Sequence, residues 1–140
     1  MIDFTWSKGF RFEINSTQVD LWIEDVVAQE GKTLGDAAVV FCSDEELLEM
    51  NKQHLNHDFY TDIITFDYTK DNVVSGDLFI SVDRVKENAE DRSLEFNIEL
   101  NRVVVHGFLH LCAYGDKGED EETMMRNKED FYLNKLKGFT

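Results

Sequence analysis

Residues 105–116 read Val-His-Gly-Phe-Leu-His-Leu-Cys-Ala-Tyr-Gly-Asp, an apolar helical stretch that carries two histidines four residues apart. Side chains at positions i and i+4 share one face of a helix, with roughly 5–6 Å between their Cβ atoms. Two imidazole nitrogens can then converge on one metal ion at about 2.0–2.1 Å each. The spacing of His106 and His110 therefore predicts a metal site.

Asp116 follows the second histidine and can join the pair only if the helix ends first. On a straight helix it would lie about 9 Å beyond His110 and well round the cylinder. We therefore expect the chain to break between Cys112 and Asp116, with Gly115 as the residue suited to a turn with positive φ. Two imidazoles and one carboxylate leave a coordination position open, as in a catalytic zinc site. The alternative is a pair of core or boundary histidines with hydrogen-bonded nitrogens.

Gly107 lies between the two histidines and bears on the class of reaction. The pattern His-Glu-x-x-His would supply a general-base glutamate for peptide hydrolysis, but position 107 has no side chain. A zincin-type peptidase is therefore the weakest hypothesis. Glycine inside a helix costs about 1 kcal/mol relative to alanine, so we expect something to approach the backbone there. Close packing of the helix on a sheet and a substrate contact are equal alternatives.

The composition is that of one folded domain, which we assign to residues 1–140. At 140 residues and 42% hydrophobic content, the chain can bury a substantial core. It has no apolar run of membrane-spanning length, and its first four residues lack the features of a secretory signal. We therefore expect a cytoplasmic protein with no membrane partner. Cys42 and Cys112 lack C-x-x-C spacing and are expected to be buried thiols.

The net charge of −15 opposes sequence-independent attachment to a polyanion, which depends on Lys and Arg. It fits attraction to a basic partner protein, or solubility alone. Solubility is the simpler explanation.

Hydrophobic periodicity predicts helices mixed with strands and no regular βαβ alternation, which favours an α+β fold. Helices are expected from Asn15 or Ser16 to Gly31, from the capping box at 43–46 to about His54, over 82–92 and 94–112, and from Glu119 onward. Strands are expected at 37–41, 61–68 and 73–81. The N-terminal segment shows aromatic alternation at Phe4, Trp6, Phe10 and Phe12. The expected buried residues are Val19, Trp22, Ile23, Val26 and Val27 in the first helix, Ile98, Val103, Val104, Val105, Phe108 and Leu109 in the histidine helix, and Phe131, Leu133 and Leu136 near the end.

Three segments carry a resemblance to a known family. Residues 106–111 read HGFLHL, residues 61–66 read TDIITF and residues 76–81 read GDLFIS. They are similar to the signature HGxLHLxGYDH and to the strands TDVLSF and GDIxIS of the bacterial YbeY family of metal-dependent endoribonucleases, the rRNA maturation factors. The resemblance runs from the region of Asn15 to the last helix. It implies a mixed β-sheet, here of about four strands, flanked by about five helices, with zinc held by three histidines in a cleft beside the sheet.

The chain departs from the family pattern at several positions. Ala113 stands where the family has glycine, Gly115 where it has aspartate, and Asp116 where it has the third histidine. We expect the helix break to shift to Gly115. Asp116 remains a plausible zinc ligand, although its negative charge would make the metal a weaker Lewis acid.

A fourth departure concerns the substrate. The family has an arginine, implied to contact a substrate phosphate, where this chain has Leu55. Leucine cannot make a charge-assisted phosphate contact. Lys52 and His57 are nearby substitutes, but each fits an ordinary exposed residue better, and His54 is expected at the surface or boundary.

The leading hypothesis is a zinc-dependent endoribonuclease that acts in maturation of the 3′ end of small-subunit rRNA. His106, His110 and Asp116 would hold one zinc ion, with His106 and His110 as the catalytic residues and Asp62 as one candidate for the general base. The expected partners are rRNA, the small ribosomal subunit and, through the acidic surface, basic ribosomal proteins. The main alternative is a ribosome-assembly or ribosome-binding module whose zinc is mainly structural. The sequence leaves the oligomeric state open.

Overall fold

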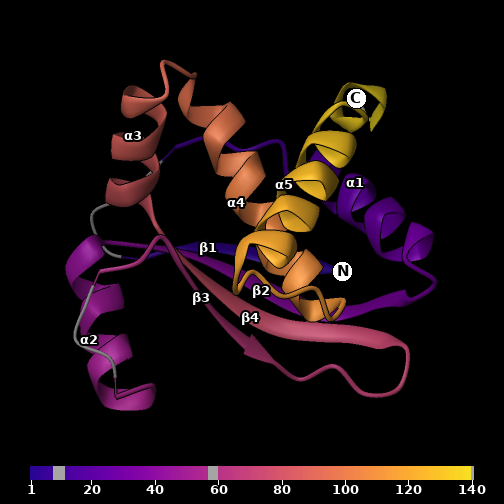
Figure 1. Cartoon of the computed structure of the whole chain (residues 1–140), viewed down its shortest axis with the longest axis horizontal. Helices are drawn as coiled ribbons and strands as arrows, with labels where there is room; N and C mark the ends of the chain where they lie inside the picture. Colours follow the sequence, from indigo (N-terminus) through magenta and orange to yellow (C-terminus); the bar gives the residue numbers. More distant parts are fainter. Residues whose placement is uncertain (8–11, 57–59, 140) are drawn as a thin grey trace.

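In the computed structural model, which describes residues 1–7, 12–56 and 60–139, a small sheet is covered by helices on both faces (Figure 1). The strands are β1 (Ile2–Trp6), β2 (Thr33–Cys42), β3 (Ile63–Asp67) and β4 (Val73–Ser81), arranged in the order β1-β2-β4-β3. The helices are α1 (Ser16–Gln29), α2 (Asp44–His54), α3 (Val82–Asp91), α4 (Phe96–Leu111) and α5 (Glu119–Leu133), followed by the 3₁₀ turn η1 (Leu136–Phe139).

The sheet is mixed, which confirms the predicted α+β class. β1 runs parallel to β2 and β2 parallel to β4, whereas β3 is antiparallel to β4. The strands predicted at 61–68 and 73–81 form the antiparallel pair β3–β4, with Ile63 opposite Ile80. The N-terminal segment supplies the edge strand β1, and the predicted strand at 37–41 is the second half of the longer β2.

Two apolar clusters fill the opposite faces of the sheet. The larger one lies between the sheet and the helices α1, α4 and α5, and the smaller one forms under α2 around Cys42, Leu47 and Ile64. Trp22 of α1 is fully buried, and its indole N–H donates to the carbonyl of Tyr132 at 2.8 Å, which ties α1 to α5. The five apolar residues predicted to be buried in α1 are all buried.

Local capping explains where the helices begin. The Asn15 side chain accepts a hydrogen bond from the Gln18 N–H at 3.1 Å, so Asn15 rather than Ser16 caps α1. The predicted capping box is present, because Ser43 and Glu46 each accept the other's backbone N–H. The acidic run at 119–122 forms an exposed first turn of α5, as expected from the helix dipole.

Two residues predicted to be buried are exposed. Ile98, in the first turn of α4, is 43% exposed, and Phe131 of α5 is 47% exposed. The buried face of α5 instead carries Met125, Glu129 and Tyr132, at spacings of four and three residues. Phe131 lies one position before Tyr132 and therefore points about 100° away from that face.

Several smaller predictions can be placed as well. Cys42 and Cys112 are buried free thiols, and burial raises the pKa of each to about 11. Among residues 1–7, 12–56 and 60–139, the helices lack the combined length and apolar character needed to span a bilayer. Phe10 and His57 lie outside the described residues.

Gly107 lets α4 lie directly on the sheet. A Cβ atom at this position would come within 2.4 Å of Leu78 Cδ2 and 2.8 Å of Ile63 Cδ1. These atoms belong to β4 and β3, so close packing of helix on sheet accounts for the glycine. A side chain at position 107 would point into the sheet.

We expect Gly107→Ala to lower the free energy of unfolding by about 1–3 kcal/mol, because overpacking outweighs the better helix propensity of alanine. Urea unfolding of the purified variant measures the change. Gly138→Ala is the matched control, since a Cβ there meets nothing within 4 Å. Its unfolding free energy should stay within about 0.5 kcal/mol of the parent. A stabilised Gly107→Ala variant would contradict the packing argument.

Candidate metal centre

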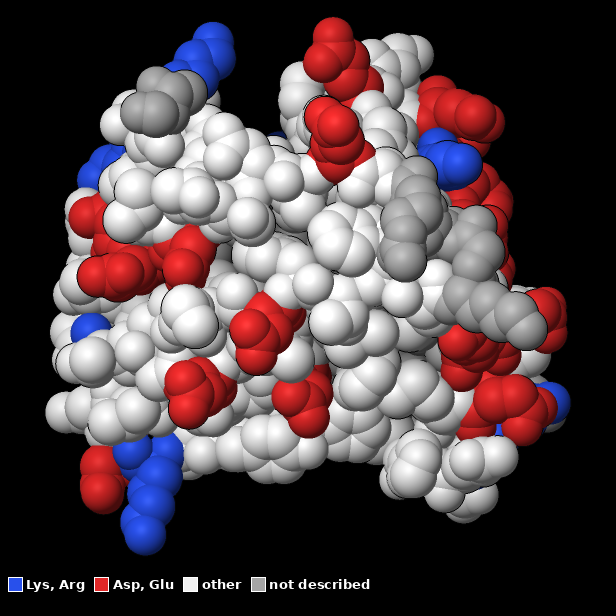
Figure 2. Space-filling model, turned by 180° about the vertical axis from the view of Figure 1, so that it is seen from behind, with Lys and Arg blue, Asp and Glu red and all other residues white. Residues whose placement is uncertain are grey.

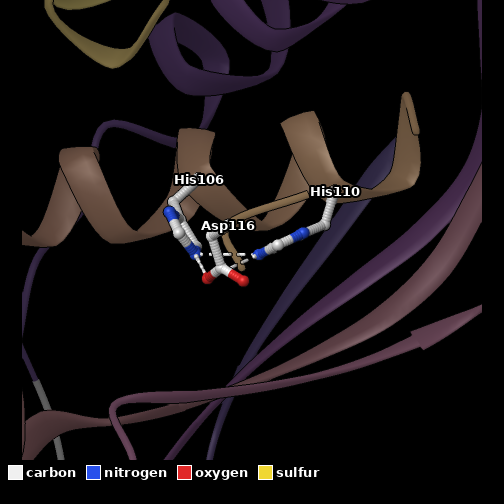
Figure 3. Close-up of side chains that lie close together, drawn as sticks. All are labelled: His106, His110 and Asp116. Atoms are coloured by element: carbon white, nitrogen blue, oxygen red, sulfur yellow. Dashed lines mark hydrogen bonds and ion pairs between the residues drawn. The ribbon is translucent and has the colours of Figure 1, made fainter. Parts of the chain in front are cut away.

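His106 and His110 project from one face of α4, and the loop after α4 returns Asp116 to meet them (Figure 3). The Nε2 atoms of the two histidines are 3.0 Å apart. The Asp116 Oδ2 atom lies 3.4 Å from Nε2 of His106 and 3.3 Å from Nε2 of His110. The structure thus brings together the three residues that the sequence nominated as metal ligands.

These separations fit one tetrahedral metal ion. Zinc takes imidazole nitrogen and carboxylate oxygen at about 2.0–2.2 Å, and the edge of such a tetrahedron is about 3.3 Å long. The three donor atoms would supply three of the ligands of such an ion. The His106, His110 and Asp116 side chains are 21%, 27% and 44% exposed, so solvent reaches the three residues.

The hydrogen-bond partners of the two imidazoles set their tautomers. Nδ1 of His106 lies 2.7 Å from the Glu129 Oε2 atom, and Nδ1 of His110 lies 2.8 Å from the Tyr114 carbonyl oxygen. Both partners are acceptors, so in neutral imidazoles each Nδ1 carries the proton and each Nε2 presents a lone pair. Two lone pairs and the Asp116 carboxylate then face one another, an arrangement that a cation stabilises.

Glu129 is the functional residue that sequence analysis missed. It is 4% exposed and bridges two groups, because its Oε1 atom accepts from Arg102 at 2.9 Å while Oε2 meets His106. A carboxylate on the second nitrogen of a metal-binding histidine fixes the ring and makes it a better ligand. A signal for it exists in the sequence, since Glu129 lies four residues after Met125 and three before Tyr132 on the apolar stripe of α5.

His106 and Glu129 each shift the pKa of the other toward its charged form. Burial alone would lower the pKa of His106, but its hydrogen bond to Glu129 and the charges of Glu129, Asp62 and Asp116 outweigh burial and raise that pKa. Burial alone would raise the pKa of Glu129, but hydrogen bonds from His106 and Arg102 overcome it and hold that pKa low. Without a metal ion, this pair therefore favours an ionised Glu129 beside a protonated His106.

The break after α4 occurs at Ala113, not at Gly115 as predicted. Ala113 has φ 79°, whereas the described glycines with positive φ are Gly31 and Gly118. The Tyr114 N–H donates to the Leu109 carbonyl and the Ala113 N–H to the His110 carbonyl, which is the double bond of a Schellman motif. This closure also aims the Tyr114 carbonyl at His110, so the helix end orients a candidate metal ligand.

We expect Ala113→Gly to raise the free energy of unfolding by about 0.5–1 kcal/mol, because a left-handed backbone strains alanine but not glycine. Ala113 is exposed, so no packing is lost. Chemical denaturation provides the measurement. The exposed helical residue Ala28 of α1 is the matched control, and Ala28→Gly should destabilise by about 1 kcal/mol. If Ala113→Gly and Ala28→Gly changed the free energy of unfolding in the same direction, the argument from backbone strain would be refuted.

Two clefts meet at the donor atoms. The α5 cleft, of about 430 Å³, is lined by Arg92, Arg102 and Arg126 among others. The β3 cleft, of about 590 Å³, is lined by Leu55, Thr61, Thr65 and Lys117 among others. Both clefts include Asp62, His106 and Asp116, so they adjoin at the site.

The structure also locates the other residues that the sequence analysis considered for the base and for the phosphate contact. Asp62, nominated as a possible base, lines both clefts. Leu55 is 41% exposed in the β3 cleft, and Lys52 and His54 are exposed on α2. Figure 2 shows one face of the molecule with acidic side chains scattered across it and basic ones near its edges.

Comparisons with known proteins agree on one family. The sequence model of a family described as Endoribonuclease YbeY matches residues 6–137. The chain belongs to the YbeY family. A relative from Parabacteroides distasonis, named Endoribonuclease YbeY, is 51% identical over 117 residues, covering 84% of this chain and 82% of its own. A relative of the same name from Flavobacterium psychrophilum is 43% identical over 139 residues, covering 99% and 96%.

A solved structure has the same fold as this YbeY chain. The solution structure of a Thermotoga maritima protein superposes with a TM-score of 0.67 at 28% identity, covering 99% of this chain and 90% of that one. The YbeY resemblance drawn from three short segments is therefore confirmed. This chain places the two histidines of the YbeY signature beside the carboxylate of Asp116, at the distances given above.

Proposed function

We propose that this protein is a zinc-dependent endoribonuclease that cleaves single-stranded RNA and acts in maturation of the 3′ end of small-subunit rRNA. The observation that carries the proposal is the triangle of donor atoms from His106, His110 and Asp116, open to two clefts, in a chain of the YbeY family. Two relatives named Endoribonuclease YbeY, at 51% and 43% identity, support the RNA-cleaving activity.

We assign a separate role to each residue of the site. His106 and His110 would hold the ion through Nε2, and Asp116 through a carboxylate oxygen. When bound, a zinc ion lowers the pKa of a water molecule and offsets charge that develops on the phosphate. Asp62 lines both clefts next to His106 and is our candidate to accept the proton of the attacking water. Glu129 keeps His106 in the tautomer that the ion requires.

The geometry disfavours the two rival functions. A structural zinc site is closed by four protein ligands, whereas the described residues bring three donors to a solvent-facing position. A zincin-type peptidase needs a glutamate at position 107, where Gly107 is packed against the sheet instead. RNA hydrolysis remains the reaction that site and family both support.

The proposal includes a place of action and partners. A cytoplasmic location, contact with rRNA and the small ribosomal subunit, and contact of the acidic surface with basic ribosomal proteins all belong to it. The excess of 29 acidic over 14 basic residues supports the last of these.

Metal analysis coupled to RNA cleavage tests the proposed function. Purified protein should carry close to one zinc ion per chain and cut an rRNA precursor that spans the small-subunit 3′ end, and chelation should stop the cutting. Asp116→Ala should lose most of the zinc, while Asp116→His, which supplies the imidazole of the family pattern, should keep it. A zinc-loaded protein that binds small subunits but cuts no RNA would favour the assembly module. Full zinc in Asp116→Ala would remove Asp116 from the ligand set.

A further inference from the structure

The α5 cleft holds three arginines that differ in how they are used. Arg92 donates to both carboxylate oxygens of Glu99, at 3.0 and 2.9 Å. Arg102 is 16% exposed and donates to Glu129 at 2.9 Å and to Asp130 at 2.7 Å. Arg102 is therefore engaged through both Nη atoms, whereas Arg92, whose side chain is 42% exposed, is engaged through Nη1 alone.

Arg126 is the exception among these three. Its side chain is 51% exposed, and its Nη1 atom lies 3.8 Å from the Glu129 Oε1 atom, beyond hydrogen-bond distance. It belongs to the second turn of α5, and it lines the same cleft as His106 and Asp116. A planar guanidinium with free donors beside a metal site suits bidentate recognition of a phosphate.

The other side of the site offers a contrast. Leu55 occupies the β3 cleft, where it supplies no charge. Among the described residues that line the β3 cleft, Lys117 is an exposed cation, and it follows the candidate ligand Asp116 in the sequence. Lysine acts as a point charge and cannot form the paired contact that arginine makes. The geometry therefore favours the α5 side for a phosphate held in a fixed orientation.

We propose that Arg126 binds a backbone phosphate of single-stranded RNA in the α5 cleft, adjacent to the phosphate at the metal centre. The proposal rests on the proposed function and names a subsite for its substrate. The cleft also contains the acidic residues Asp62, Asp116 and Glu122, which repel an RNA backbone. In a protein with net charge −15, Arg126, at 51% the most exposed of the three arginines that line this cleft, then carries a large share of the RNA affinity.

Binding of the zinc-loaded protein to a labelled, phosphorothioate-linked single-stranded RNA tests the proposal. Arg126→Gln should raise Kd about tenfold, as expected for losing one charge-assisted contact. It should also reduce the slope of log Kd against log salt by about 0.7, the share of one phosphate on a single strand. Arg126→Lys should keep most of the slope while still weakening affinity. Zinc content should be unchanged in both variants.

Two matched variants remove the same charge elsewhere. Lys70 lies in the turn between β3 and β4, away from both clefts. Lys70→Gln should therefore leave Kd and the slope of log Kd against log salt unaltered. Lys117→Gln probes the rival cation of the β3 cleft. An effect of Lys117→Gln that exceeds the effect of Arg126→Gln would overturn the assignment, as would zinc loss in Arg126→Gln, because the change would then act through Glu129.

The outcomes separate this proposal from the proposed function. If the parent binds RNA and Arg126→Gln binds equally well, the Arg126 subsite is wrong while endoribonuclease activity stands. If binding depends on Arg126 but unmodified RNA is not cut, the proposed function fails and the binding site stands. A parent protein that binds no RNA refutes both.

Discussion

His110→Ala should strip the protein of its metal ion and of RNA cleavage together. Nε2 of His110 lies 3.0 Å from Nε2 of His106 and 3.3 Å from Asp116, so its removal leaves two donors of three. Loss of an outer partner of a metal ligand costs about ten- to hundredfold in affinity, and loss of the ligand itself should cost more than about a hundredfold. Zinc content after dialysis and single-turnover cleavage of RNA measure both effects.

His54→Ala is the matched control for that change. His54 is an exposed imidazole at the end of α2, and its ring contacts Phe66 rather than the site. This variant should keep its zinc and its activity. Retention of one zinc ion per chain in His110→Ala would show that the ion, if present, is held elsewhere.

Glu129→Ala is expected to have the largest effect on stability. It leaves the half-buried Arg102 and His106 side chains without the buried carboxylate that joins them, and breaking a buried charged pair costs about 3–5 kcal/mol. Zinc affinity should also fall by about ten- to hundredfold, because His106 loses its orienting partner. Denaturant unfolding of metal-free protein and zinc titration with a competing chelator report the two effects separately.

Asp130→Ala is the control for Glu129→Ala. Asp130 also accepts from Arg102, at 2.7 Å, but its side chain is 53% exposed. An exposed pair contributes about 0–1 kcal/mol, so this variant should unfold nearly like the parent. Similar losses of unfolding free energy in Glu129→Ala and Asp130→Ala would show that burial of the Glu129 carboxylate does not determine its contribution to stability.

The pKa shifts of His106 and Glu129 predict how the free energy of unfolding of the metal-free protein changes with pH. The raised pKa of His106 adds stability that is complete below its unfolded value, about 6.5, and is lost as pH rises through the folded pKa. The lowered pKa of Glu129 adds stability that is complete above its unfolded value, about 4.3, and is lost as pH falls through the folded pKa. The stability difference between the parent and Glu129→Gln should therefore be largest between about pH 4.3 and 6.5. A difference that is flat with pH would contradict the pairing.

Periodicity in the sequence was sufficient to predict α4, the helix that carries the two histidines, and most of the elements around it. Spacing along α4 places His106 and His110 on one face, and local capping signals locate the starts of α1 and α2. These are short-range properties, in which each residue's partner lies within one helical turn. The ligand pair could thus be predicted without knowledge of the fold.

The remaining parts of the site depend on contacts between distant segments. Glu129 lies 23 residues after His106, and only the docking of α5 on α4 brings them together. The helix break was assigned to Gly115 on intrinsic preference, yet it occurs at Ala113. Tyr114 explains the difference, because its hydroxyl donates to Glu30 of the distant α1 region at 2.6 Å. Tertiary anchoring of Tyr114 overrides the local preference of glycine for positive φ.

The bond between Glu129 and His106 has a consequence for the lifetime of the folded protein. It joins α5, which supplies none of the three candidate donors, to His106 of α4, which a bound ion would hold. A ligand that binds only the docked arrangement stabilises it in proportion to its free concentration. Amide hydrogens at 125–132 should therefore exchange more slowly with deuterated water when zinc is added. Zinc supply would then control how often the C-terminal helix opens and becomes accessible to proteases.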